Sequence, residues 1–282
     1  MSEYEDILYN VQDRIAVVTL NRPDKLNAWT AAMQASVKRA IVDASKDDNV
    51  RVIVITGAGR GFCAGADMAN LQQIRPQNWN ERELAHADGS IKVDPRPDLG
   101  PDVSAHYAGR FGYLMSIKKP IIAAINGPCA GIGLVFTLYC DLRFAASDAK
   151  FTTAFAQRGL IAEHGVSWLL PRIVGTPHAL DLLLSARKVD ACEAAQMGLV
   201  NRTFPQENFI GSVMAYARYL VDIVSPRSMA VMKAQVWKAL FQDLNEAIAI
   251  GDAEMQKSFA TQDFKEGVEH FVEKRVAKFT GR

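Results

Sequence analysis

At residues 57–67 the chain reads Gly57-Ala58-Gly59-Arg60-Gly61-Phe62-Cys63-Ala64-Gly65-Ala66-Asp67. The β-branched run before it, over 52–55, predicts a buried strand that stops at Gly57. Four glycines and three alanines leave little side chain to bury, so the useful groups of this stretch are on its main chain. Asp67 follows where a helix could begin, and an acidic residue suits a helix N-terminus. We expect this loop to offer a main-chain N–H to a carbonyl oxygen that becomes an anion.

A second stretch has the same organisation. An apolar run over 121–125 predicts a strand, and Asn126-Gly127-Pro128 ends it. Cys129-Ala130-Gly131-Ile132-Gly133 then leads into an apolar helix expected over 134–140. Free N–H groups at a helix start and the helix dipole both favour negative charge. Together the two loops could form an oxyanion hole with two donors.

Composition excludes several classes of function. The 282 residues are 49% hydrophobic and 22% charged, as in an ordinary globular protein with a sizeable core. A formal net charge of +1 gives no argument for nucleic acid or an anionic membrane as partner. The cysteines lack CxxC spacing and are expected to be reduced and structural, and the histidines lack metal-site spacing. Without a signal peptide or a bilayer-length apolar run, we expect a cytoplasmic protein.

The remaining pattern before residue 120 alternates strand and helix. A strand over 15–20, apolar on both faces, precedes a turn over 21–25 and a helix starting near Thr30. One face of that helix is expected to carry Trp29, Met33, Val37, Ala40, Ile41 and Ala44. Residues 71–110 are rich in proline and charge and are expected to form a mobile, partly disordered loop or lid. A short helix over 108–117 should follow.

The second half is expected to become largely helical. Strands over 142–145 and 150–153 precede an irregular loop over 156–165 that carries Glu163. Helix starts are predicted at Thr176-Pro177, at Asp190 with Glu193, and at Ser225-Pro226, with a helix stop at Gly198. An amphipathic run covers 209–224. The final helix, expected over 264–278, has an apolar face that would dock on its own domain or on a neighbouring subunit.

At these two loops the chain resembles the crotonase, or enoyl-CoA hydratase/isomerase, superfamily over almost its full length. The motifs that carry the resemblance are Asn21-Arg22-Pro23, Lys25-Leu26-Asn27-Ala28, Ile55-Thr56-Gly57, Phe62-Cys63-Ala64-Gly65-Ala66-Asp67, Lys119-Pro120-Ile121, Asn126-Gly127, Gly131, Cys140-Asp141, Arg143-Phe144-Ala145, Pro171-Arg172, Val174-Gly175 and Phe264-Lys265-Glu266-Gly267. Each motif is a weak signal, but together, in order and at family-like intervals, they are specific.

The resemblance implies an α/β fold, a spiral of ββα units with a helical C-terminal trimerisation region. Residues 1–200 would form the core with the active site, including the mobile insertion 71–110, and residues 201–282 the helical region. It also implies an acyl-CoA thioester as substrate, and a homotrimer or a hexamer built as a dimer of trimers. No metal is expected, and no separate cofactor, since coenzyme A is part of the substrate.

Site residues carried over by position fall into two groups. The oxyanion donors would be the N–H groups of Ala66 and Ile132, each worth roughly 3–4 kcal/mol of barrier. The residues expected along coenzyme A or the substrate are Lys25, Leu26, Ala28, Ala64, Ala66, Asp67, Met68 and Ile132.

The catalytic carboxylates are where the chain departs from the family pattern. Hydratases of the family use two glutamates, and the matching positions here are Val135 and Phe155, which cannot carry a proton. Glu163 matches a third place, where some isomerases and dehalogenases of the family hold their working carboxylate. Its apolar neighbours could raise its pKa, so Glu163 is the candidate acid or base. His164 is a weaker candidate for a second proton carrier.

Other interpretations stay open at this point. Glu163 could be a structural carboxylate paired with Arg158 or Arg172, His164 a structural histidine, Asp67 a helix cap and Lys25 an ordinary surface residue. The family resemblance favours enoyl-CoA hydratase, whereas the missing glutamates favour a double-bond isomerase, dehalogenase or hydrolase. A C–C hydrolase that acts without coenzyme A and a non-catalytic acyl-CoA binder are the remaining alternatives.

Overall fold

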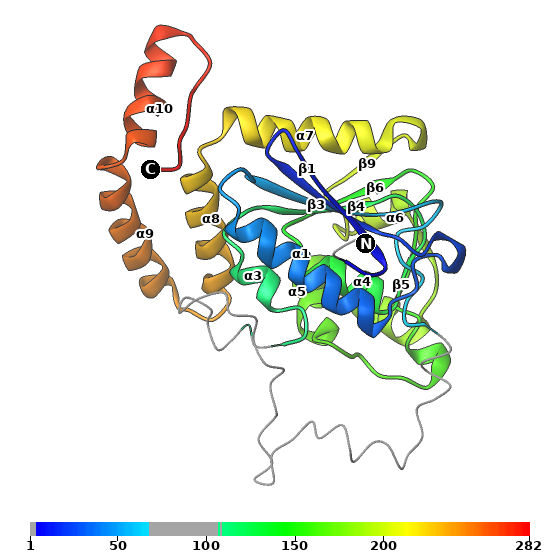
Figure 1. Ribbon diagram of the computed structural model, residues 1–282. Coiled ribbons are helices and arrows are strands. Elements are labelled where there is room, and N and C mark those ends of the chain that lie inside the picture. Colours follow the sequence, from blue (N-terminus) through cyan, green and yellow to red (C-terminus); the bar gives the residue numbers. More distant parts are fainter. Residues whose placement is uncertain (1–3, 68–106, 108) are drawn as a thin grey trace.

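A central sheet carries the loops of interest in the computed structural model, which describes residues 4–67, 107 and 109–282 (Figure 1). Its strand order is β1-β2-β3-β4-β6-β9, with β1 antiparallel to β2 and every other neighbouring pair parallel. The strands are β1 (Ile7–Gln12), β2 (Ile15–Leu20), β3 (Val52–Gly57), β4 (Ile121–Ile125), β6 (Leu142–Ala146) and β9 (Arg202–Phe204). A smaller sheet has the order β5-β7-β8, formed by β5 (Cys129–Ala130), β7 (Lys150–Thr152) and β8 (Val189–Asp190).

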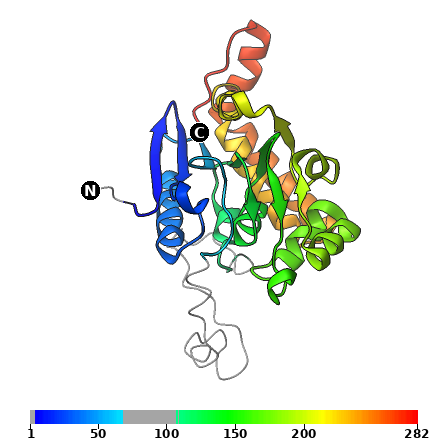
Figure 2. The same cartoon turned by 90° about the vertical axis from the view of Figure 1, so that its right-hand side faces the viewer.

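Helices cover the central sheet on both faces. The α-helices of the described residues are α1 (Ala31–Lys46), α3 (Tyr113–Ser116), α4 (Ile132–Leu138), α5 (Val166–Ser185), α6 (Ala191–Gln196), α7 (Phe209–Ile223), α8 (Pro226–Ala239), α9 (Leu244–Phe259) and α10 (Gln262–Glu273). Short 3-10 turns are η1 (Pro23–Lys25), η4 (Ala156–Arg158) and η5 (Gln206–Asn208). In Figures 1 and 2, α7 lies on one side of the sheet, and α1 and α4 lie on the other.

The alternation of side chains between the two faces of each strand explains why helices cover both faces of the sheet. Val52 and Val54 of β3 pack with Val213 and Val221 of α7. Residues between them, such as Ile53, belong to the core on the opposite face with α1 and α4. Successive side chains of a strand point to opposite faces, so an all-apolar strand needs a cover on both. This confirms the α/β fold class expected from the sequence.

Several boundaries differ from those expected. β3 follows the apolar run over 52–55 and ends at Gly57, as expected, but α4 begins at Ile132 rather than at residue 134. Helix α3 covers only Tyr113–Ser116 of the helix expected over 108–117. The final helix, expected to run to residue 278, ends at Glu273, and the next residue, Lys274, has a left-handed conformation. The predicted mobile insertion lies almost wholly outside the described residues.

Local helix signals are confirmed. Thr30, Asp190 and Ser225 each accept a hydrogen bond from the backbone of the helix that follows, as N-caps do. Gly198 has a φ of 79° after α6, and a break in α5 falls at Gly175, just before the Thr176-Pro177 pair.

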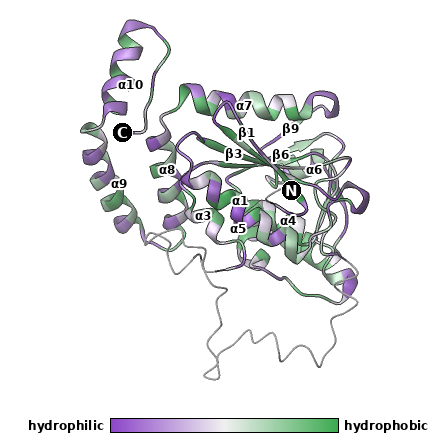
Figure 3. Ribbon diagram, in the orientation of Figure 1, coloured by the Kyte–Doolittle hydropathy of each residue, from purple (hydrophilic) through white to green (hydrophobic). Residues whose placement is uncertain are grey.

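The C-terminal helices form a lobe beside the sheet. Helices α8, α9 and α10 lie to one side of the body in Figure 1, and green and purple residues alternate along α9 and α10 in Figure 3. Apolar side chains on the last two helices are exposed: Leu244, Ile248, Met255, Phe259, Phe264, Val268, Phe271 and Val272. No helix of the described residues is long and apolar enough to cross a membrane.

Candidate active site

The first glycine-rich loop is held by the side-chain amides of two asparagines. Asn27 is fully buried and donates to the carbonyl oxygens of Ala58 (3.0 Å) and Gly61 (2.8 Å). Asn126 accepts from the Gly57 N–H (3.1 Å) and donates to the Gly57 oxygen (2.9 Å). A side chain at Gly57 would collide with the Gly61 carbonyl oxygen. The loop after β3 is therefore close-packed, and the side chains of Asn27 and Asn126, which lie outside the loop, hold its shape.

The two glycine-rich loops lie side by side, because β3 and β4 are parallel neighbours and their carboxyl ends share one edge of the sheet. Cys63 and Cys129 form an isolated parallel bridge between the loops. In it the Cys63 N–H donates to Pro128 O (3.1 Å), and the Ala130 N–H donates to Cys63 O (2.9 Å). The structure thus brings together the two segments that hold Ala66 and Ile132.

Trp29 determines the direction of the Ala66 N–H. The Trp29 N–H donates to Gly65 O (2.8 Å), and the Asp67 N–H donates to Trp29 O (3.1 Å). Trp29 therefore bonds to the residues on either side of Ala66, and the N–H of Ala66 itself points away from Trp29.

Ile132 is the first residue of α4, where an N–H has no partner inside the helix. Within residues 4–67, 107 and 109–282, neither the Ala66 N–H nor the Ile132 N–H has a recorded backbone or side-chain acceptor. Both groups are therefore available as donors as far as the described chain is concerned.

Glu163 lies in the loop between η4 and α5, with 34% of its side chain exposed. Its Oε2 is 3.6 Å from Nε2 of His164. Partial burial raises the pKa of the Glu163 carboxyl, and the positive charge of Arg110 opposes that rise. A raised pKa brings a carboxylate closer to the range in which it can act as both acid and base.

The charged partner of Glu163 is not one that the sequence suggested. Arg158 donates to Ala154 O (2.8 Å), and Arg172 donates to Trp168 O (2.8 Å) and stacks on the Trp168 ring. Arg110, which precedes α3, is the recorded charged neighbour of Glu163 instead.

His164 is neutral at physiological pH. Burial, followed by the charge of Arg110, lowers the pKa of His164 to about 4. The hydroxyl of Tyr139 donates to His164 O (2.8 Å) and fixes the backbone there. His164 therefore cannot serve as a resident proton donor at neutral pH, although its ring can accept a hydrogen bond.

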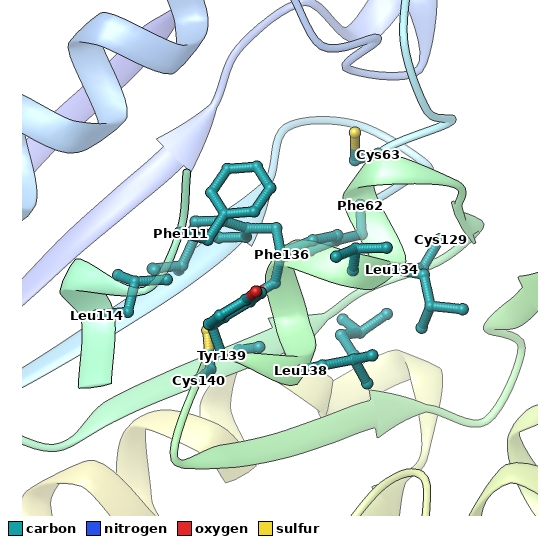
Figure 4. Close-up of a cluster of buried hydrophobic side chains, with 14 of the residues drawn as sticks. Phe62, Cys63, Phe111, Leu114, Cys129, Leu134, Phe136, Leu138, Tyr139 and Cys140 are labelled. Atoms are coloured by element: carbon teal, nitrogen blue, oxygen red, sulfur yellow. The ribbon is translucent and has the colours of Figure 1, made fainter. Parts of the chain in front are cut away.

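An aromatic cluster connects the loop of Glu163 to both glycine-rich loops. Phe111 packs edge-on against the His164 ring (centroids 6.2 Å apart), the Phe136 ring (5.3 Å) and the Trp29 ring (5.7 Å). Phe136 lies one helical turn after Ile132, and Trp29 is bonded to both neighbours of Ala66. Figure 4 shows Phe111 and Phe136 together, with Cys63 and Cys129 of the two loops nearby.

The positions where hydratases of the family carry glutamate are part of the core. Val135 is fully buried and Phe155 is 6% exposed, and both belong to the main hydrophobic cluster. Neither offers a group that could carry a proton or hold water.

Most residues expected along coenzyme A lie around the first loop. Leu26 accepts from the Ala64 N–H through its carbonyl (2.9 Å), so the Lys25-Leu26 turn borders the loop, and Lys25 is exposed. Nη1 of Arg22 donates to Ala28 O (2.7 Å) and to Oδ2 of Asp67 (2.8 Å). Asp67 thus forms an ion pair, while Met68 and any helix after Asp67 lie outside the described residues.

Four residues around the site do not stand out in the sequence. Asn27 belongs to a short motif, Trp29 follows the period of the helix face, and no pattern marks Gln34 or Arg110. The available signal was chemical: an asparagine in an apolar surrounding needs hydrogen-bond partners, and a glycine-rich loop with free carbonyls provides them.

Comparisons with known proteins agree over the full length. The family model described as enoyl-CoA hydratase/isomerase matches residues 10–89 and 102–282. A 1,2-epoxyphenylacetyl-CoA isomerase of Escherichia coli K12 is 32% identical over 279 residues, 99% of each chain. A probable enoyl-CoA hydratase of Rhodobacter capsulatus is 35% identical over 281 residues, 99% of each chain. A crystal structure of an enoyl-CoA hydratase subunit from Geobacillus kaustophilus superposes with a TM-score of 0.85 at 30% identity, covering 100% of each chain.

Proposed function

The chain belongs to the enoyl-CoA hydratase/isomerase family of acyl-CoA enzymes, and from this premise we propose a mechanism with one carboxylate and two main-chain donors. The N–H groups of Ala66 and Ile132 hold the thioester oxygen, and Glu163 moves the proton. The observation that carries the proposal is the bridge between Cys63 and Cys129, which places the two donor segments against each other.

Electrostatics explains why such an arrangement accelerates the reaction. Removing a proton next to a thioester puts negative charge on its oxygen, and a preorganised donor stabilises that charge by roughly 3–4 kcal/mol. The helix dipole of α4 adds to this at Ile132, although α4 is short.

Double-bond isomerisation is the reaction that one carboxylate serves best. The ionised carboxylate of Glu163 takes a proton from Cα of a 3-enoyl thioester, and the electron pair moves to the thioester oxygen as a dienolate. Glu163, now protonated, returns the same proton to Cγ, and the product is the 2-enoyl thioester. No second acid or base is required, in agreement with the apolar Val135 and Phe155.

Hydration is the second candidate, because one observation favours it. Neutral His164 lies 3.6 Å from Glu163 and could hold a water molecule while Glu163 takes its proton. The two candidates differ in the substrate consumed: a 3-enoyl-CoA for the isomerase and a 2-enoyl-CoA for the hydratase.

The test compares wild-type protein with Glu163→Gln on 3-hexenoyl-CoA and crotonyl-CoA. We expect isomerisation of the first substrate, and a loss of at least about a hundredfold in kcat for the variant. Glu207→Gln, at an exposed glutamate of η5, is the matched control and should retain full activity. Equal turnover by wild type and Glu163→Gln would exclude Glu163. Binding of acyl-CoA without turnover of either substrate would favour a non-catalytic binder.

The assembly is also a proposal. The exposed apolar residues of α9 and α10 support a homotrimer, or a hexamer made of two trimers, in which these faces are covered. Light scattering on the purified protein gives the mass in solution, and a monomer at micromolar concentration would contradict it.

A further inference from the structure

Gln34 lies between the loop of Ala66 and the loop of Glu163. Its side-chain oxygen accepts two hydrogen bonds, from Nε1 of Trp29 (2.9 Å) and from Nε of Arg110 (2.7 Å). Gln34 is in the first turn of α1, where its own N–H donates to Thr30 O (3.0 Å). One fixed oxygen thus joins the Trp29 side chain to Arg110.

Arg110 continues this connection to His164 and Glu163. Its Nη1 lies 3.5 Å from Nε2 of His164, which is 3.6 Å from the Glu163 carboxylate. Because the guanidinium is planar, fixing Nε at Gln34 also fixes the direction of Nη1. The charge of Arg110 is therefore held in a set place beside the Glu163–His164 pair.

We propose that Arg110 is a positioning residue: held by Gln34, it orients His164 and favours the ionised form of Glu163, the form that accepts a proton. Trp29 links this support to the donor loop, because its backbone is bonded on both sides of Ala66. A single set of contacts then aligns the donor at Ala66 and the base at Glu163. This inference rests on the proposed function of Glu163.

The surroundings of the pair define how its protonation responds to a mutation. Among the described residues, the titratable or charged groups recorded beside Glu163 and His164 are Arg110, the hydroxyl of Tyr139 and each other. Burial raises the pKa of Tyr139 to about 12, so it stays neutral. Removing the Arg110 charge should raise the pKa of both Glu163 and His164, since that charge opposes protonation of each.

Arg110→Met, Arg110→Lys and Gln34→Leu are compared with wild type. For Arg110→Met we expect the acidic limb of kcat/KM to move to higher pH by about one unit, and kcat to fall about tenfold, with KM within about twofold. For Arg110→Lys we expect the acidic limb of kcat/KM at the same pH as in wild type, because lysine keeps the positive charge. Gln34→Leu lowers kcat with a smaller shift, since the charge is no longer held in place. Arg172→Met, at an exposed arginine that contacts Trp168, is the control.

A second readout does not require activity. Titration of the His164 ring, followed by NMR of histidine-labelled protein, should give a higher pKa in Arg110→Met than in wild type. An unchanged His164 titration, or an unchanged acidic limb in folded Arg110→Met, overturns the proposal. If wild type turns over neither enoyl-CoA, the proposed function fails, and the NMR titration still decides whether Arg110 controls the pair.

Discussion

Gly131 lies directly against Gly65: a Cβ atom on Gly131 would be 3.7 Å from the Gly65 Cα. Both glycines have positive φ, 51° for Gly131 and 104° for Gly65. Each directly precedes one of the two residues assigned as donors, Ile132 and Ala66. At 3.7 Å this Cβ would make only an ordinary van der Waals contact, so the positive φ values are what favour glycine at these two positions.

Gly133→Ala should disturb the donor pair. A Cβ at Gly133 would lie 2.6 Å from Cys63 Cβ and 2.7 Å from its sulfur, so α4 must move away from the first loop. We expect kcat to fall by about 10²–10³-fold, and stability by about 1–3 kcal/mol. Gly251→Ala, in α9, is the matched control and should be neutral or stabilising, because its Cβ would make only an ordinary contact, 3.8 Å from the Gln235 amide nitrogen. A folded Gly133→Ala protein with full kcat would contradict the arrangement.

Asn27→Asp should destabilise the fold. Asp keeps the shape and the acceptor for the Arg22 N–H, but it loses both donors to the Ala58 and Gly61 oxygens. The Ala58 oxygen would lose its side-chain donor and the Gly61 oxygen would keep only the longer bond from Asn126 (3.4 Å), so urea unfolding should show a loss of about 2–4 kcal/mol. The exposed Asn49→Asp serves as control, and a loss no greater than that of the control would show that Asn27 does not hold the loop.

Stability should depend on pH through His164. Its pKa is lowered to about 4 in the folded protein from 6.5, so the unfolded chain binds the proton more readily in between. The free energy of unfolding therefore rises with pH over this interval, by at most about 3 kcal/mol from this group. His164→Phe should lose that part of the slope, whereas His178→Phe, at an exposed position, should keep it. The free energy of unfolding is measured with urea at about pH 5 and pH 7. If it changes by the same amount in wild type and in His164→Phe, His164 is not buried as described.

Lys25→Ala should weaken substrate binding and leave the chemistry intact. Lys25 is exposed beside the loop that contains Ala64, where it could contact the phosphates of coenzyme A. We expect KM to rise about three- to tenfold at unchanged kcat, since one charged contact is lost equally in ground and transition state. The exposed Lys46→Ala, at the far end of α1, is the control. A fall in kcat with constant KM would place Lys25 elsewhere in the mechanism.

Local signals in the sequence predicted much of the fold. Thr30, Asp190 and Ser225 cap helices because a side-chain oxygen next to a free N–H is a contact within a few residues. Strands β2 and β4 have the predicted bounds, since each is a short apolar run with turn residues at its end. The family resemblance supplied the layout that these local patterns could not, and the family match and the fold confirm it.

Contacts between residues far apart in the chain could not be predicted from the sequence pattern. Trp29 follows the helical period of α1, yet it precedes the helix and pairs with Ala66. This pairing could not be predicted, because a bridge to a loop 37 residues away leaves no signal in the neighbouring sequence. Arg110 follows a segment without clear periodicity. Nothing in the sequence therefore indicated that Arg110, and not Arg158 or Arg172, is the charged neighbour of Glu163. In both cases the choice of partner is made by the packing of the whole domain.

A crystal structure with butyryl-CoA, a saturated thioester that cannot isomerise, tests the central claim most directly. We predict the thioester oxygen at about 3 Å from the main-chain nitrogens of both Ala66 and Ile132, with a Glu163 oxygen within about 3.5 Å of Cα. A thioester oxygen bonded to neither nitrogen, or a Glu163 carboxylate turned into solvent away from Cα, would contradict the account.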